Sequence, residues 1–175
     1  LTAGALGSLG TAGNHLDINS ANGGTGTFTI LGSGLDAYII ETIGALTLNT
    51  VQVGPGAGGA ARTAYLTAPN TGSGSDRGRI LNGAAAGATN VTVGSVWLQA
   101  SGDIGELSSG RAITTAVGAV EALSDGGNVV LDNLGAVQIG GVVAGGWNGK
   151  TVNGIAAPGA NVQFNARGAI TQSEF

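Results

Sequence analysis

Apolar and polar residues alternate with a period of two in short runs along most of this chain. Clear examples span 45–53 ("ALTLNTVQV"), 95–100 ("SVWLQA"), 128–133 ("NVVLDN") and 161–166 ("NVQFNA"). This period sends successive side chains to opposite faces of a strand, so one face of each run points inward. Because Gly, Asn, Asp and Ser separate the runs at roughly ten-residue spacing, the pattern predicts an all-β protein.

Three stretches interrupt the alternation and concentrate glycine, proline and polar residues: 54–61, 70–88 and 144–160. We expect them to form loop excursions from the body of the fold. The segment 111–124 ("RAITTAVGAVEALS") also has apolar residues at helical spacing. Its β-branched residues and Gly118 disfavour a helix, so we predict strand there.

One short phrase recurs along the chain, a glycine followed two residues later by an aliphatic residue. It occurs in "AGALGSL" (3–9), "SGDIGEL" (101–107) and "RGAITQS" (167–173), at spacings of 98 and 66 residues, close to multiples of 33. A second echo joins 43–51 to 134–142. We predict that the matched residues occupy equivalent corner and core positions, one above another: Gly4, Leu6, Gly102, Ile104, Gly168 and Ile170.

Recurrence of short alternating strands is typical of a β-solenoid, in which each coil pairs with the coils above and below it. Neighbouring coils then lie about 4.8 Å apart, and a narrow interior favours the small aliphatic residues seen here. The 13 asparagines suit tight corners and hydrogen-bonded ladders between coils. With about 25–33 residues per coil, the chain would form about five to seven parallel coils.

Composition narrows the function classes. Charged residues make up 9% of the 175 positions, against about 25% in ordinary domains. The chain has no cysteine and a single histidine, His15, so we expect neither a metal site nor a cofactor. The net charge of −4 and the scattered basic residues argue against nucleic acid as a partner. No apolar run approaches the roughly 18 residues of a membrane span.

Longer phrases of the chain resemble a known family: "LTAGALGSLGTAGNHLDI", "GNVVLDNLGAVQIGGVV" and "NVQFNARGAIT". They look like the repeats of filamentous-haemagglutinin-like bacterial exoproteins, adhesins of the two-partner-secretion type. The resemblance covers most of the chain outside the three excursions. It implies a right-handed β-helix, export, and a place in a long fibre at the bacterial surface. It supplies no catalytic residues.

Asp103 and Glu106 are the first candidates for chemistry, since paired carboxylates at a suitable separation can hydrolyse glycosides. In the aligned phrases their places are taken by other residues: Ala5 and Ala169, and Ser8 and Gln172. We therefore interpret the two acids as variable decoration of a corner and predict that the protein is not an enzyme.

Two segments, 31–39 and 71–79, echo a glycine- and aspartate-rich calcium-binding nonapeptide. The two copies are imperfect and forty residues apart, so they do not supply adjacent coils. We predict ordinary turns and keep calcium binding as the alternative.

The aromatic residues and His15 complete the candidates. His15 follows a turn, and we expect it to face solvent or cap that turn. Trp97 lies in an alternating strand, where it either faces outward or fills a wide coil. Trp147 lies in the excursion 144–160; we expect it to pack back on the rod, with a role as an exposed contact residue as the alternative.

These observations predict a structural module: one β-solenoid segment, of a longer or polymerising chain, in a secreted bacterial fibre or surface adhesin. Neither end of the chain carries an obvious polar cap. We therefore expect both ends to meet other copies or adjacent solenoid segments. Adhesion to a host or matrix ligand through the loops is a second role. The alternative function is a β-helix polysaccharide lyase or hydrolase, or a carbohydrate-binding domain.

Overall fold

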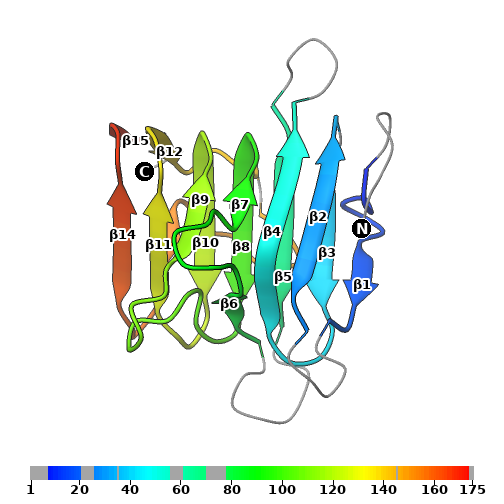
Figure 1. Ribbon diagram of the computed structural model, residues 1–175, viewed down its shortest axis with the longest axis horizontal. Helices are drawn as coiled ribbons and strands as arrows, with labels where there is room; N and C mark the ends of the chain where they lie inside the picture. Colours follow the sequence, from blue (N-terminus) through cyan, green and yellow to red (C-terminus); the bar gives the residue numbers. More distant parts are fainter. Residues whose placement is uncertain are drawn as a thin grey trace.

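Two parallel sheets, stacked face to face, make up the computed structural model (Figure 1), which describes residues 8–20, 26–34, 36–55, 61–69, 78–144 and 146–173. These residues contain no helix. We call the sheets A and B. Sheet A holds β2 (Phe28–Ser33), β4 (Leu46–Gly54), β6 (Ile80–Asn82), β7 (Val91–Thr92), β9 (Ile113–Ala116), β11 (Val129–Asn133) and β14 (Val162–Ala166). Sheet B holds β1 (Leu16–Ile18), β3 (Ala37–Glu41), β5 (Thr63–Ala68), β8 (Ser95–Ala100), β10 (Ala119–Ser124), β12 (Val137–Ile139), β13 (Ile155–Ala156) and β15 (Ile170–Gln172).

The chain alternates between the two sheets, and each strand pairs in parallel with strands of its own sheet from the coil before and the coil after. This arrangement confirms the predicted all-β parallel solenoid. The segment 111–124 forms β9 and β10, as the β-branched residues indicated. The right-handed sense and the number of coils stay predictions.

The core lies between the sheets and consists of columns of aliphatic side chains, one residue from each coil. One column in sheet A runs through Leu46, Ile80, Ile104, Val129 and Val162. The first four of these side chains are fully buried. A thin interior of this kind suits the alternating Val, Leu, Ile and Ala of the sequence, because each residue packs on its equivalents one coil away.

The predicted stacking of the recurring phrase is wrong. Ile104 pairs with Ile80 and Val129 of sheet A, whereas Ile170 pairs with Val137 of sheet B. Gly102 and Gly168 therefore lie at different corners, while Gly4 and Leu6 lie outside the described residues. The second echo fails in the same way, since 43–51 contributes to β4 of sheet A and 134–142 to β12 of sheet B. Strands of both sheets follow the same local pattern, so similarity of phrases does not identify the sheet.

The register of the strands shows that two similar segments of the sequence stack on each other. "NVVLDNLGAVQI" (128–139) stacks residue by residue under "NVQFNARGAITQ" (161–172), with Val129 on Val162 and Val137 on Ile170. The two segments share asparagine, valine, glycine and alanine at matching positions, 33 residues apart. The preceding coil is shorter, because Asp103 bonds to Asn128 at a separation of 25.

The excursions differ in part from the predicted ranges. Within 70–88, residues 70–77 lie outside the described residues, and Ile80–Asn82 forms β6, with Ile80 in the core. Within 54–61, only the ends are described. The third excursion leaves sheet B after β12 and rejoins it at Ile155–Ala156, so it begins a few residues earlier than 144.

Candidate functional site

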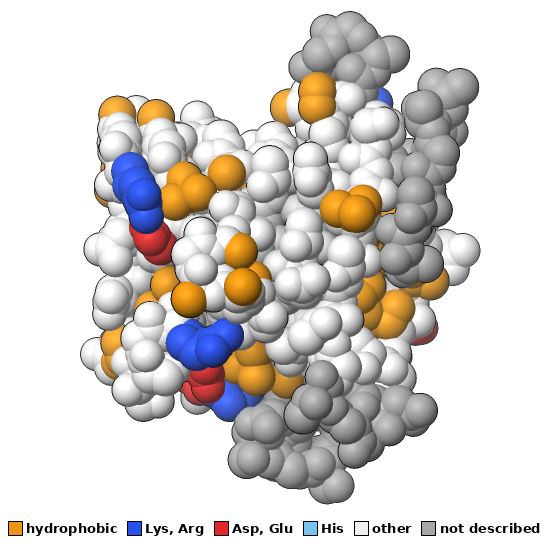
Figure 2. All heavy atoms as spheres, viewed as in Figure 1, with side chains coloured by type: hydrophobic (Ala, Val, Ile, Leu, Met, Phe, Trp, Pro, Cys, Tyr) orange, Lys and Arg blue, Asp and Glu red, His pale blue; other side chains and the backbone are white. Residues whose placement is uncertain are grey.

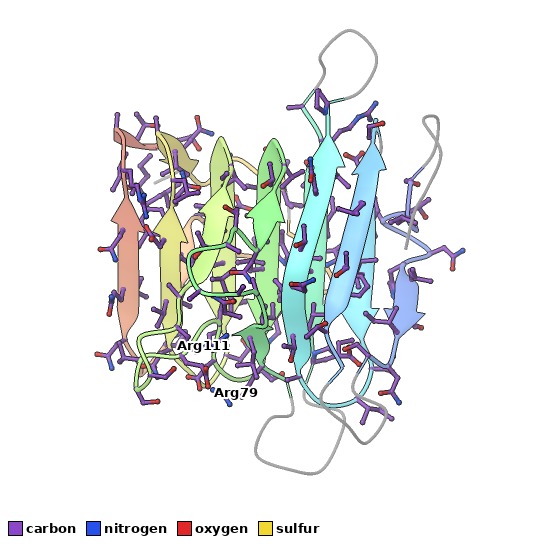
Figure 3. The ribbon with its side chains drawn as sticks, viewed as in Figure 1. Arg79 and Arg111 are labelled. Atoms are coloured by element: carbon purple, nitrogen blue, oxygen red, sulfur yellow. The ribbon has the colours of Figure 1, made fainter. Side chains whose placement is uncertain are left out.

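Arg79 lies at a corner of the solenoid (Figure 3). The two carboxylates singled out in the sequence, Asp103 and Glu106, both contact it. The Arg79 Nε lies 3.3 Å from Asp103 Oδ2, and its Nη2 donates to Glu106 Oε1 at 3.4 Å. Glu106 also accepts a hydrogen bond from Ser109 Oγ at 3.2 Å and exchanges two backbone hydrogen bonds with Arg111. Both acids thus hold the corner and the 106–111 turn together, which is a structural role.

A shallow groove of about 350 Å³ lies on the outer face of sheet A, near this corner. Asp132 lines it, 3.7 Å from Arg167, which lines it too. Asp103 and Glu106 do not line it. Figure 2 views this side of the molecule, where few charged side chains interrupt an uncharged surface. Within the described ranges, no three His, Asp or Glu side chains gather where they could hold a metal ion.

Asp36, from the first of the two calcium-like segments, bonds to the next coil. Asp36 Oδ1 accepts the backbone N–H of Thr63 at 2.8 Å, and its Oδ2 lies 3.9 Å from Arg62 Nη1. This carboxylate therefore links its own coil to the next one. Most of the second turn, 71–77, lies outside the described residues.

The outer face of sheet B carries a different structure, which we call the strap: residues 140–144 and 146–154, between β12 and β13. β12 pairs with Ala119 and Val120 of β10, and β13 pairs with Ala122 and Leu123 of the same strand. β12 and β13 thus pair with the two halves of β10, and the strap is inserted between them, opposite Glu121. Lys150 ties it to the rod through an ion pair with Asp125 at 3.0 Å.

Trp147, in the strap, packs on side chains of sheet B. Its Nε1 donates to Thr67 Oγ1 at 3.0 Å, across a sequence separation of 80. Its ring lies 5.3 Å from that of Tyr38 and 5.2 Å from that of Tyr65, and only 6% of Trp147 is exposed. Trp147 therefore packs on the rod, as expected, and is too buried to serve as an exposed contact residue.

Every tyrosine and tryptophan of the chain belongs to this face of sheet B. The register places Tyr38, Tyr65 and Trp97 in one column on successive strands, with the two tyrosine rings stacked 4.4 Å apart. Trp97 is fully buried. Burial of Tyr65, reinforced by Tyr38, raises the pKa of Tyr65 to about 12.

His15 borders the aromatic cluster. Its Nδ1 lies 2.8 Å from Asp17 Oδ1, and its ring meets the Trp147 ring edge-on at 6.1 Å. About a third of the His15 side chain is exposed. The residue thus lies at the rim of the covered face.

Two buried glutamates were missed by the sequence interpretation. Glu121 accepts the backbone N–H groups of Val142 and Val143 at 3.2 and 3.1 Å and so anchors the start of the strap. Glu41 accepts the backbone N–H and the hydroxyl of Ser20, and burial raises the pKa of Glu41. The available signal was a charged residue inside a run of apolar and aromatic neighbours, which favours a buried, hydrogen-bonded carboxylate.

The two ends of the solenoid differ in exposure. At the C-terminal end, β14 and β15 are the edge strands, and Val162 and Ile170 are 46% and 52% exposed although they continue buried columns. At the N-terminal end, Phe28 and Ile30 of the edge strand β2 are 6% and 0% exposed, whereas Leu16 and Ile18 of the other edge strand, β1, are half-buried. The expectation that both ends meet other coils stays a prediction, and the C-terminal end is the candidate functional surface.

Comparison of the chain with protein-family models, curated proteins and solved structures finds no match. Among the described residues, no helix has the length and apolarity to cross a membrane. The open C-terminal end, the covered face of sheet B and the corner contacts are the features of the molecule that bear on its function.

Proposed function

We propose that this protein is a structural module of an extracellular bacterial fibre or surface adhesin, in which the rod lengthens by stacking of β-solenoid coils end to end. The observation that carries the proposal is the open C-terminal end. There, two strand edges lie beside half-exposed aliphatic side chains whose equivalents in the preceding coil are buried.

The physical reason is the cost of an uncovered edge. A parallel strand at a sheet edge presents unpaired N–H and C=O groups, and a coil stacked on it satisfies them. The same coil removes Val162 and Ile170 from water, at about 25 cal/mol per Å² of apolar surface. Each added coil repeats the interface that already joins β11 to β14 and β12 to β15.

The bacterial and extracellular parts of the proposal rest on the resemblance to filamentous-haemagglutinin-like repeats. Low charge supports close packing of coils, since net charge is what keeps protein surfaces apart. The engagement of Asp103 and Glu106 with Arg79 supports a structural role for these acids in place of catalysis.

Carbohydrate binding is the second candidate function, and one observation favours it. The groove on sheet A brings Asn82, Arg111, Thr114, Asp132 and Arg167 together around about 350 Å³. These side chains offer hydrogen-bond donors and acceptors that suit sugar hydroxyls. Turnover of a polysaccharide that Asp103→Ala abolishes would replace both candidates with an enzyme.

The test compares two isoleucines with nearly equal exposure. Ile170, at the open end, is 52% exposed, and Ile43, outside the named strands, is 51% exposed. In the purified protein, the C-terminal edge strands of one copy can stack on the N-terminal edge strands of another, so we expect wild type and Ile43→Lys to form end-to-end assemblies in electron micrographs at high concentration. Ile170→Lys should remain single. The proposal is overturned if all three proteins stay single, or if Ile170→Lys pairs as readily as Ile43→Lys.

A further inference from the structure

We infer that the C-terminal end selects a coil of defined chemistry: a parallel coil with asparagine or aspartate over Asn161, an aliphatic residue over Val162, and glycine over Gly168. The inference rests on the proposed function and adds the identity of the partner. Three kinds of stacked residue support it: a ladder of polar side chains, a glycine that lies on a glycine, and aliphatic side chains. Each stack ends at the last coil, which contains β14 and β15.

The first column is a polar ladder at one corner. Asp103 Oδ1 accepts the backbone N–H of Asn128 at 2.7 Å and its Nδ2 at 3.1 Å. Asn128 Oδ1 in turn accepts the backbone N–H of Asn161 at 3.1 Å and its Nδ2 at 3.2 Å. In each rung, a side-chain oxygen of the lower coil accepts two hydrogen bonds from an asparagine of the upper coil, one from its backbone N–H and one from its side-chain Nδ2. Asn161 supplies the next oxygen, which accepts no hydrogen bond seen among the described residues.

Only an amide residue in the next coil reproduces this rung in full. A backbone N–H alone gives one of the two hydrogen bonds, and each is worth roughly 1 kcal/mol net. An aspartate keeps the backbone bond and offers its oxygen to the following coil, as Asp103 does. An apolar residue keeps the backbone bond alone and offers no side-chain oxygen to the following coil.

The second column is glycine on glycine. A Cβ on Gly168 would lie 2.4 Å from the backbone nitrogen of Ala136 and 2.8 Å from the carbonyl carbon of Gly135. Gly127 shows the same crowding at the other corner, where a Cβ would lie 2.6 Å from the carbonyl carbon of Gly102. In both cases the later glycine comes so close to the coil below that no side chain fits. A Cβ on Gly135 would meet nothing within 4 Å, so the close approach belongs to the step from Gly135 to Gly168, and a next coil that repeats this step needs glycine over Gly168.

The third column is aliphatic and sets the register. Val162 and Ile170 continue columns in which Val129 and Val137 are buried. A slip by one residue would send the apolar side chains of the new coil outward, so these two positions fix the alignment. The spacing from Asn161 is one residue to the aliphatic, seven to the glycine and nine to the second aliphatic. Asn128, Val129, Gly135 and Val137 have identical spacing in the coil below.

The described N-terminal edge strands differ from this surface. Phe28 and Ile30 of β2 are buried, and Leu16 and Ile18 of β1 are half-buried. The ladder, the glycine contact and the exposed aliphatic residues described above belong to the C-terminal end.

The test appends a candidate coil to the full chain. A flexible Gly/Ser linker and a second copy of the sequence 161–173 are added after Phe175, which holds the copy near the end at a high effective concentration. Three versions are made: the native copy, Asn161→Leu in the appended copy only, and Gly168→Val in the appended copy only. Amide hydrogen exchange is then followed by NMR in β14, β15 and β2.

We expect the native copy to slow exchange at the free edges of β14 and β15 by about tenfold, with no change in β2, and both altered copies to lose this protection. Equal protection by the leucine or the valine copy would overturn the inference but leave end-to-end stacking intact, since any apolar strand would then suffice. Protection in β2 would show that the appended copy binds at the other end of the rod and would overturn the inference. If no copy protects β14 and wild type still pairs end to end, the inference alone fails; if it does not pair, the proposed function fails too.

Discussion

Val129 and Val162 occupy the same place in the same phrase, one coil apart, yet Val129 is fully buried and Val162 is 46% exposed. The opposite end of the rod differs again, because Ile30 of the edge strand β2 is fully buried. The same stacking rule thus yields an interior, a buried edge strand at β2 and exposed edge strands at β14 and β15. The pattern of a repeat shows what can stack, and exposure shows where stacking is still incomplete.

The strap is the contact that spans most of the distance between the ends. In a simple solenoid each coil touches only its neighbours, so stability is a sum of local terms. Here Trp147, in an excursion from β12, bonds to Thr67 of β5 and packs on Tyr38 of β3. The strap therefore makes the folding of early and late strands interdependent.

The largest expected effect comes from removing this contact. Trp147→Ala should lower the free energy of unfolding by about 3–5 kcal/mol, because it leaves a cavity over Tyr38 and Tyr65 and an unbonded Thr67. Urea denaturation followed by circular dichroism measures the change. Trp147→Phe, which keeps a ring but loses the N–H, should recover at least half of the loss. A loss below about 1 kcal/mol for Trp147→Ala would show that the strap does not couple the strands.

A matched pair of isoleucines probes the two ends directly. Ile30→Ala should cost about 2–5 kcal/mol, because the side chain is fully buried. Ile170→Ala should cost less than about 1 kcal/mol in dilute protein, because the side chain is half exposed before any coil covers it. Equal costs in chemical denaturation would contradict the difference between the buried edge strand β2 and the exposed edge strand β15.

The polar ladder offers a smaller comparison of the same kind. Asn128→Ala should cost about 1–2 kcal/mol, since it removes the side-chain hydrogen bond to Asp103 below and the two hydrogen bonds that Asn161 donates from above. Asn161→Ala should cost about half as much or less, because only the lower rung exists. Thermal unfolding of the two variants at one protein concentration provides the readout, and the reverse order would contradict the ladder.

The smallest expected effect is a pH dependence of the free energy of unfolding, which comes from Glu41 of β3. Burial raises the pKa of Glu41 above its ordinary value of 4.5, although hydrogen bonds from Ser20 oppose the rise. The folded state then keeps the Glu41 proton to a higher pH than the unfolded chain does. Stability from this group is therefore complete below pH 4.5 and falls as the pH rises through the folded pKa. Glu41→Gln should flatten the fall in urea midpoint across that window; an unchanged slope would mean that Glu41 is not responsible.

The architecture could be predicted from the sequence because it depends on local rules. Alternation in runs such as 95–100 and 161–166 fixes which side chains point inward, and the β-branched residues of 111–124 favour strand over helix. The preference of Trp147 for packing on the rod follows from its size and apolarity. These features require no knowledge of which coil pairs with which.

Register and the strap could not be derived in this way. Both sheets use the same phrase, so the likeness of Gly102 and Gly168 does not reveal that they lie at different corners. The repeat of 128–139 in 161–172 was available and would have given the correct pairing there. The contact of Trp147 with Thr67 joins residues 80 apart, and no local pattern specifies it. Burial of Glu41 depends on Ser20 from another segment for the same reason.

Amide hydrogen exchange on the wild-type protein, measured residue by residue from low to high protein concentration, tests the central claim most directly. The account predicts that amides at the free edges of β14 and β15 gain protection as the concentration rises, while those of the interior strand β8 stay unchanged. Protection that stays constant in β14 and β15 would contradict an accepting C-terminal end.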